Sequence, residues 1–168
     1  MKLSTVAAVL ALAIAGCATT ASEDAATTKN DNTNNTLAVA KQFLTAAGSG
    51  DGATLMALTD EDFVWHNEGD SRLPWIGNWA GKQTVFGTFM PAFGKGLSVT
   101  AWTTDYEFVN GNQAVFMGTM AADANNTGVN TGLMSWAVRV HVEDGKVKSW
   151  NWFEDSYAVS QAYHGKRK

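Results

Sequence analysis

His66 is the first side chain in this sequence that is a candidate for proton transfer in a ligand site. It ends a strand-like run, 62–66, and a loop rich in Gly and Trp follows it. An imidazole there could act as a general acid or base near neutral pH, although a hydrogen-bonded histidine at the rim of a cavity would give the same pattern. We therefore predict His66 as a catalytic residue, with a rim histidine as the alternative.

Asp155 is the second predicted catalytic residue. It follows the last strand-like run, and in an apolar cavity the pKa of its carboxyl would rise toward a useful value. Asp155 is also a good N-cap for the short helical tail that begins at Ser156. Glu154 has the opposite strand parity, so it is the alternative for a carboxylate that points inward.

Aromatic residues are abundant, with seven Trp and eight Phe in 168 residues. Indole rings are rarely buried completely without a partner for the N–H, so this number predicts a pocket wall or a dimer surface in addition to a core. The predicted lining residues are Trp65, Trp75, Trp79, Phe86, Met90, Tyr106, Phe116, Trp136 and Trp152.

The sequence favours neither a metal ion nor a cofactor. The three histidines are far apart, and no acidic cluster has the spacing of a calcium loop. Gly94-Lys95-Gly96 lacks the preceding strand that a phosphate-binding loop needs. A net charge of −4 gives no electrostatic reason to bind nucleic acid. We expect the partner to be a small, mostly apolar molecule.

The single cysteine, Cys17, is explained by the N-terminus. Lys2 and an apolar run over 6–15 precede it, and the run is too short to span a bilayer. Ile14-Ala15-Gly16-Cys17 resembles the bacterial lipobox, which implies that residues 1–16 are a signal peptide and that Cys17 carries the lipid, including palmitate, that anchors the protein in a membrane. Ala18 in place of Asp implies the periplasmic side of the outer membrane if the source is Gram-negative.

Residues 17–34 contain no aromatic or large aliphatic residue after the cysteine, so we expect a flexible tether there. Residues 35–168 predict one α+β domain. Helical spacing covers 37–47, 53–58 and 82–93, with Pro91 expected to kink or end the last of these. Strand-like runs cover 62–66, 97–109, 113–123, 132–142 and 146–154. This order predicts a strongly curved antiparallel sheet wrapped around the N-terminal helices and enclosing a pocket.

The turn between the last two strands allows two registers. A three-residue loop, Glu143-Asp144-Gly145, pairs Val142 with Lys146 and gathers the apolar residues of both strands on one face. A two-residue loop shifts the pairing by one and brings polar side chains opposite the indoles. We favour the three-residue loop because it separates apolar from polar residues.

The order of elements resembles the nuclear-transport-factor-2-like superfamily, the cone-shaped fold of ketosteroid isomerases and SnoaL-like polyketide cyclases. Segments similar to the SnoaL-like branch are Gly50-Asp51-Gly52, 62–66, 77–82 (GNWAGK) and 143–147 (EDGKV) with an acidic residue ten positions after its Gly. The resemblance covers 36–163. It implies a ligand pocket on the concave side of the sheet and a homodimer through the outer face, where Arg139, Asn151 and Phe153 lie.

The resemblance leaves the function open, because this fold serves enzymes and non-enzymatic modules alike. One interpretation is a cofactor-independent acid–base enzyme of isomerase or lyase type, in which His66 and either Asp155 or Glu154 act on a small apolar molecule, for example a cyclic one. The alternative is a binding or assembly module of the cell envelope, and a third is a fold whose cavity is filled by Trp side chains. A titratable group within reach of an open cavity would favour the enzyme.

Overall fold

The computed structural model describes residues 20–165, with the backbone alone over 20–30, so the predicted signal peptide and Cys17 lie outside the described residues. The helical elements are α1 (Thr20–Ser49), α2 (Gly52–Leu58), α3 (Lys82–Thr84), the π-helical turn η1 (Val85–Phe89), α4 (Met90–Gly96) and α5 (Ser156–Tyr163). The strands are β1 (Thr59–Asn67), β2 (Gly77–Ala80), β3 (Leu97–Trp102), β4 (Tyr106–Asn110), β5 (Gln113–Ala124), β6 (Val129–Asn130), β7 (Met134–Glu143) and β8 (Lys146–Glu154). The predicted α+β class is confirmed. No helix of the described part is long and apolar enough to cross a membrane.

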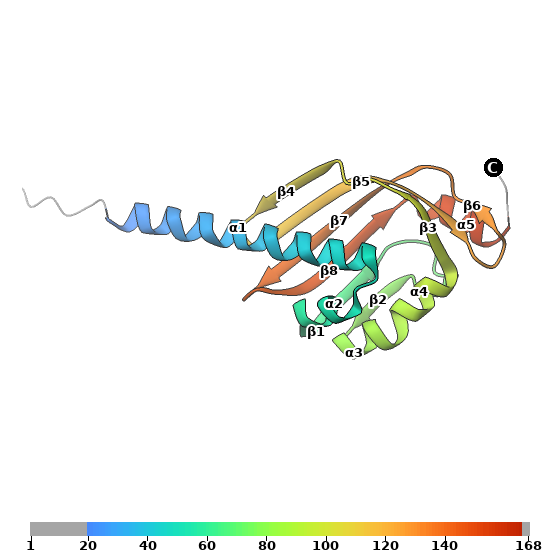
Figure 1. Cartoon of the computed structure of the whole chain (residues 1–168), viewed down its shortest axis with the longest axis horizontal. Coiled ribbons are helices and arrows are strands. Elements are labelled where there is room, and N and C mark those ends of the chain that lie inside the picture. The colour runs from blue at the N-terminus through green and yellow to red at the C-terminus, as the bar shows by residue number, and fades with distance from the viewer. Residues whose placement is uncertain (1–19, 166–168) are drawn as a thin grey trace, which may run out of the picture.

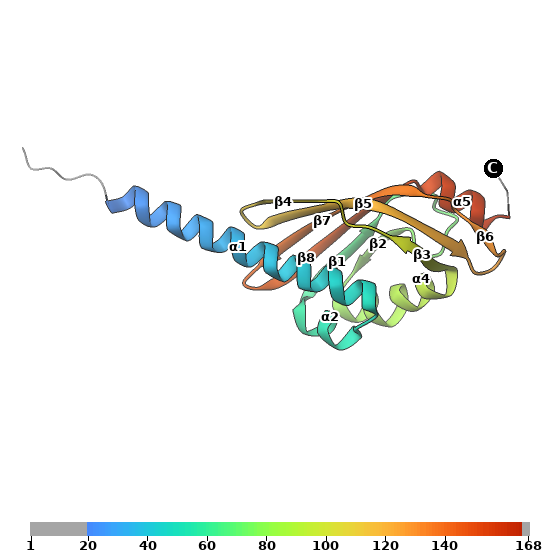
Figure 2. The ribbon, with the colours of Figure 1, turned by 45° about the horizontal axis from the view of Figure 1, so that its top comes forward.

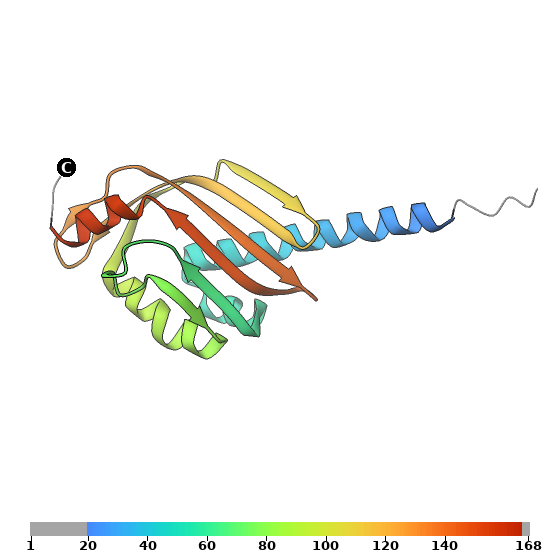
Figure 3. The same cartoon turned by 180° about the vertical axis from the view of Figure 1, so that it is seen from behind.

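One curved sheet carries the fold, with strand order β2-β1-β8-β7-β5-β3 and with β4 and β6 also paired to β5. All pairs are antiparallel except β1 with β8. Figures 1 and 2 show α1 crossing the concave side of this sheet, with α2 and the α3–α4 segment beside it. Figure 3 shows the opposite side, where no helix covers β7 and β8.

Strand periodicity places the core on the concave face. Along β7 the side chains of Met134, Trp136, Val138, Val140 and Val142 are buried, and those between them are half-buried or exposed. Alternation of this kind follows from the two-residue period of a strand. Phe43 of α1 packs against this face through Trp150 of β8, with ring centroids 5.1 Å apart.

The hairpin between β7 and β8 corrects the predicted loop. The turn has two residues, Asp144 and Gly145, with φ of 50° and 71°, which is the arrangement that suits the twist of a tight hairpin. A bulge then shifts the register, because Val142 pairs with Val147 whereas His141 pairs with Ser149. The extra residue, Lys148, restores the apolar face that the three-residue loop was expected to produce.

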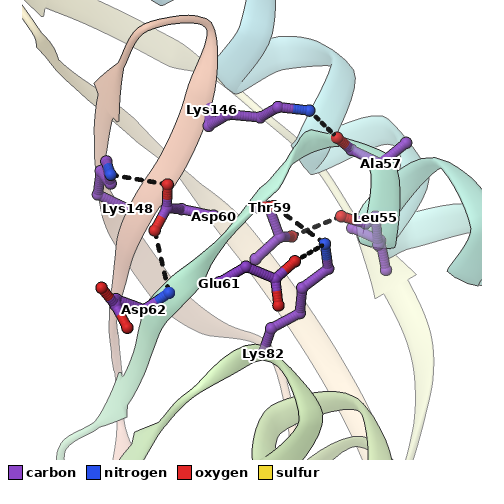
Figure 4. A network of polar contacts seen from close by, with 9 residues as sticks. All are labelled: Leu55, Ala57, Thr59, Asp60, Glu61, Asp62, Lys82, Lys146 and Lys148. Atoms are coloured by element: carbon purple, nitrogen blue, oxygen red, sulfur yellow. Dashed lines mark hydrogen bonds and ion pairs between the residues drawn. The ribbon is translucent and has the colours of Figure 1, made fainter.

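Lys148 also belongs to a polar network that holds the start of β1 (Figure 4). Its Nζ lies 2.7 Å from Oδ2 of Asp60, and Nζ of Lys82 lies 3.0 Å from Oε1 of Glu61. Lys82 also donates to the Thr59 carbonyl, and Lys146 donates to the Ala57 carbonyl. These contacts tie β1 to α3 and β8, and β8 to α2, and β1 carries two residues of the cavity described below.

Helix α1 differs from the sequence-based expectation at its N-terminal end. It begins at Thr20, within the stretch expected to be a flexible tether, and Figures 1 and 2 show this part projecting beyond the sheet. Burial begins at Thr36 and continues through Ala40, Phe43 and Ala46. Adding a residue to an existing helix costs far less than starting one, so the packed part supports the projecting turns.

Two further elements also differ in length or continuity. The run 97–109 is divided into β3 and β4, because the chain at Thr103 crosses over Gly118 so closely that a Cβ there would lie 2.0 Å from the Thr103 carbonyl oxygen. The segment 82–96 passes Pro91 without ending. It widens into η1, where the Met90 N–H reaches the Val85 carbonyl, because Pro91 has no N–H to donate.

Candidate functional site

A cavity of about 360 Å³ opens between α1, α4 and the concave face of the sheet. Its lining residues are Leu44, Ala47, Gly48, Trp65, Asn67, Met90, Phe93, Val99, Trp102, Met120, Trp150 and Trp152. None of these side chains is ionisable. The cavity therefore offers a neutral and mostly apolar environment to a ligand.

Four indoles form much of the wall. Trp65 of β1 and Trp150 of β8 are adjacent in the parallel pair and stack with centroids 5.0 Å apart. Trp102 of β3 stacks on Trp136 at 4.2 Å and lies 5.8 Å from Trp152, with the three ring planes within 25° of one another. Near-parallel ring faces of this kind favour flat ligands.

Asn67 is the amide side chain of the lining. It lies two residues after Trp65 on the same face of β1, and its Oδ1 accepts a 2.8 Å hydrogen bond from Nε1 of Trp65. Its Nδ2 donates a 3.5 Å bond to the Trp75 carbonyl. Because an amide nitrogen carries two hydrogens, one donor remains for a ligand.

Glu154 lies directly behind the wall. It follows Trp150 and Trp152 at the two-residue spacing of β8, and its Oε2 accepts a 2.9 Å bond from Nε1 of Trp152. Its Oε1 is buried and has no hydrogen-bond partner. Burial raises the pKa of the Glu154 carboxyl, with a smaller contribution from the charge of Asp155, while the bond from Trp152 lowers it.

The predicted catalytic His66 lies on the other face of β1. It sits between Trp65 and Asn67, and a strand directs alternate side chains to opposite sides. Its Nε2 lies 2.8 Å from Oε1 of Glu68, and its neighbours across the sheet are Asn78 and Asn151. The structure does not bring His66 to the cavity.

The predicted catalytic Asp155 caps helix α5. Its Oδ1 accepts a 3.0 Å bond from the Ala158 N–H, and the residue is exposed. This is the N-cap alternative that the sequence also allowed. Of the two neighbouring carboxylates, Glu154 is the one that points inward.

The nine residues predicted to line the pocket fall into four groups. Trp65, Met90 and Trp152 line the cavity. Trp136 stacks against the lining residue Trp102 but is not itself part of the lining. Four others pack elsewhere in the helix-covered layer: Trp75, Trp79, Phe86 and Phe116. Tyr106 lies on β4 with 63% of its surface exposed.

Several lining residues were missed in the sequence analysis. Trp150 and Asn67 could have been found from strand parity, since each is two residues from a residue that was predicted. To predict Trp102 as a lining residue, one would have to know that the chain divides into β3 and β4 after it, and no local sequence pattern indicates that division. The backbone of Gly48 and the side chain of Leu44 enter because α1 ends over the opening.

No group of three or more His, Cys, Asp or Glu side chains in the described part is arranged to hold a metal ion.

Comparison with known proteins identifies the fold. A family model described as SnoaL-like domain matches residues 40–150. No match is found among curated proteins. A nuclear-transport-factor-2-like protein from Burkholderia xenovorans has a TM-score of 0.69 and 21% identity, with 78% of this chain and 97% of that chain covered.

Two other solved structures are similar. A putative isomerase from Rhodopseudomonas palustris has a TM-score of 0.66 and 14% identity, covering 76% of this chain and 97% of that one. TerC, co-crystallised with polyporic acid, has a TM-score of 0.66 and 13% identity, covering 77% and 98%. At these identities the likeness shows the fold alone.

Proposed function

The chain belongs to the SnoaL-like domain family, and from that premise we propose that it is a lipid-anchored envelope protein that binds a small, flat, uncharged molecule in its aromatic cavity. The observation that carries the proposal is the cavity itself. Four indoles surround it, the lining contains no ionisable side chain, and Asn67 provides a directed polar contact. Ligand sites commonly combine an apolar wall with a few placed polar groups.

The cavity also limits the kind of ligand. A charged molecule would lose its hydration without gaining an ionic partner, so a neutral molecule is favoured. Ring faces suit the indoles, and a carbonyl or hydroxyl oxygen suits the remaining N–H of Asn67. TerC, which shares the fold, was co-crystallised with polyporic acid, and this precedent supports a small molecule as the ligand class.

The anchor is supported by the N-terminal sequence. Lipid on Cys17 would hold the protein at a membrane, and the projecting part of α1 would lie between that lipid and the folded domain. Metabolic labelling with palmitate tests this part. Label should enter the wild-type protein and be lost in Cys17→Ser, and equal labelling of both would overturn the anchor.

Acid–base catalysis is a second candidate function, favoured by Glu154. Its inward carboxyl has one oxygen bonded to a wall residue and one oxygen without a partner, and burial raises its pKa, so it holds its proton to a higher pH than an exposed carboxyl, as a general acid requires. In this version Glu154 takes the place of His66 and Asp155. The test of this candidate function is the effect of Glu154→Gln on turnover, because the substitution preserves the shape of the side chain and removes its ionisable proton.

A cavity-filling variant tests ligand binding. Gly48 lines the cavity and has nothing within 4 Å of the position of a Cβ, so Gly48→Leu is the variant chosen to narrow the opening. Gly52→Leu is the matched control, because Gly52 also has open space and lies in α2 outside the lining. Native mass spectrometry of the lipidated protein purified from its host should show a bound small molecule in the wild type and in Gly52→Leu, and at least tenfold less in Gly48→Leu. Equal occupancy of all three, or none in the wild type, would overturn the proposal.

The outer face of the sheet supports the further proposal of a homodimer. Tyr106, Met117, Ala137 and Phe153 form one row across β4, β5, β7 and β8. Met117 and Phe153 are 41% and 43% exposed, and no helix covers this row (Figure 3). An exposed apolar row bordered by Arg139 and Asn151 fits an isologous contact with a second copy.

A further inference from the structure

Helix α4 is fixed at both ends and loosely held between them. Phe89, just before it, is buried and lies 4.9 Å from Trp65, and Leu97, just after it, is buried as well. Residues 90–95 are half-buried or exposed. Met90 and Phe93 are the residues of this stretch that pack on the core, and the ring of Phe93 lies 6.0 Å from those of Phe89 and Trp75. A stretch whose other residues make few buried contacts is typical of a segment that opens locally.

The two sides of this helix face two different hollows. Met90 and Phe93 line the ligand cavity. Pro91 and Lys95, which lie four residues apart on another side of α4, line a second hollow of about 440 Å³. Gly87 of η1 and the residues Pro74, Asn126 and Tyr163 complete it. The second hollow gives α4 room to move away from the ligand cavity.

The backbone of this segment is weak for a helix. It begins in the π-helical turn η1, and Pro91 removes a backbone donor. Gly87 and Gly94 are exposed, with nothing within 4 Å of the position of a Cβ, so packing does not require a glycine at either place. Each glycine lowers helix stability relative to alanine.

Asn125 holds the C-terminal end of α4. Its Nδ2 donates to the carbonyls of Gly94 and Lys95, at 3.3 and 3.2 Å, and its Oδ1 accepts a bond from Ser98. These bonds are exposed, so water can replace them when the helix moves. The N–H of Leu97 donates to the Phe93 carbonyl at the same end.

We propose that α4 is the gate of the ligand cavity: it moves outward into the second hollow to admit the ligand, and the side chain of Asn125 holds it closed. The gate rests on the proposed ligand-binding function. It assigns Met90 and Phe93 to the moving wall and the indoles of the sheet to the fixed wall. Entry and exit of the ligand then share one opening step, so a change in that step alters both rates and leaves the affinity unchanged.

Two variants should act in opposite directions. Asn125→Ala removes two bonds to α4, and Asn130→Ala is its matched control, because Nδ2 of Asn130 also makes two exposed side-chain bonds, to Thr100 and Asp123, and Asn130 lines neither hollow. Gly94→Ala strengthens α4, and Gly52→Ala, which also has open space, is its control in α2. We expect exchange of the Leu97 amide to be about tenfold faster in Asn125→Ala and about fivefold slower in Gly94→Ala.

Ligand rates are measured with the lipidated protein in phosphatidylcholine vesicles, by stopped-flow quenching of Trp fluorescence with 1,4-naphthoquinone. Association and dissociation rates should both rise in Asn125→Ala and both fall in Gly94→Ala, by the factors seen in exchange, with Kd within twofold of wild type and with both controls unchanged. Altered exchange with unaltered rates would overturn the gate while ligand binding stands. A wild type that shows no saturable quenching would overturn ligand binding and the gate with it.

Discussion

The indole N–H of Trp152 donates a 2.9 Å hydrogen bond to Oε2 of Glu154, which joins a ring of the cavity wall to a buried carboxyl. The protonation state of Glu154 therefore acts on the surface that a ligand would meet. Ionisation would strengthen this bond, since a charged acceptor binds a donor more tightly, but it would also place a charge where burial disfavours it.

Glu154→Gln should change how stability depends on pH. Burial raises the pKa of Glu154 above its ordinary value of 4.5, so the folded protein keeps this proton at pH values where the unfolded chain has lost it. The resulting stabilisation is fully present below 4.5 and is lost as the pH rises through the raised pKa of the folded state. Wild type should thus lose stability relative to Glu154→Gln as the pH increases from 4 to 8 in chemical denaturation. Parallel curves for the two proteins would contradict the assignment.

Asn67→Ala should destabilise the fold by about 2 kcal/mol, because Nε1 of Trp65 would lose its acceptor in a buried place. Asn78→Ala is the control, since Asn78 is exposed on the neighbouring strand β2, opposite His66. Urea denaturation gives both values. A change below 0.5 kcal/mol in Asn67→Ala would mean that water or a repacked neighbour satisfies the indole.

The sheet was predictable where alternation is regular. The spacing of Trp136, Val138 and Val140 indicates one buried face, and that face is buried. The bulge at Lys148 was not predictable, because a three-residue loop and a tight Asp144-Gly145 turn followed by one extra residue keep the same faces together. The division of 97–109 depends on the approach of Thr103 to Gly118, which only the folded chain produces.

The site was predictable only in part, and the reason is the same: alternation along a strand is visible in the sequence, but contacts between distant segments are not. The prediction for catalysis was Asp155, which caps α5, whereas strand parity made Glu154 the alternative, and Glu154 is the carboxylate that points inward. Parity could also have placed His66 outward, since Trp65 on one side of it was expected inside. The pairing of Trp102 with Trp136 joins strands distant in sequence, and no local pattern carries that information.

Gly118→Ala should be strongly destabilising. A Cβ on Gly118 would lie 2.0 Å from the Thr103 carbonyl oxygen, which is backbone and also accepts a bond from Nε1 of Trp136. We expect a loss of about 3 kcal/mol in thermal or urea unfolding. Gly52→Ala meets no atom within 4 Å and should leave stability unchanged or raise it by up to about 1 kcal/mol. Similar values for the two variants would contradict the close crossing of the chain over β5.

Phe153→Glu should separate the proposed homodimer into monomers. Phe153 lies in the exposed apolar row beside Ala137, and a carboxylate there would have to lose its hydration when two outer faces meet. Tyr157→Glu is the control, because Tyr157 is also exposed but belongs to α5, outside that row. Sedimentation velocity of the lipidated protein in detergent should give a dimer for wild type and Tyr157→Glu, and a dissociation constant at least tenfold weaker for Phe153→Glu. A monomeric wild type would overturn the dimer, and a dimer that tolerates Phe153→Glu would place its interface on another surface.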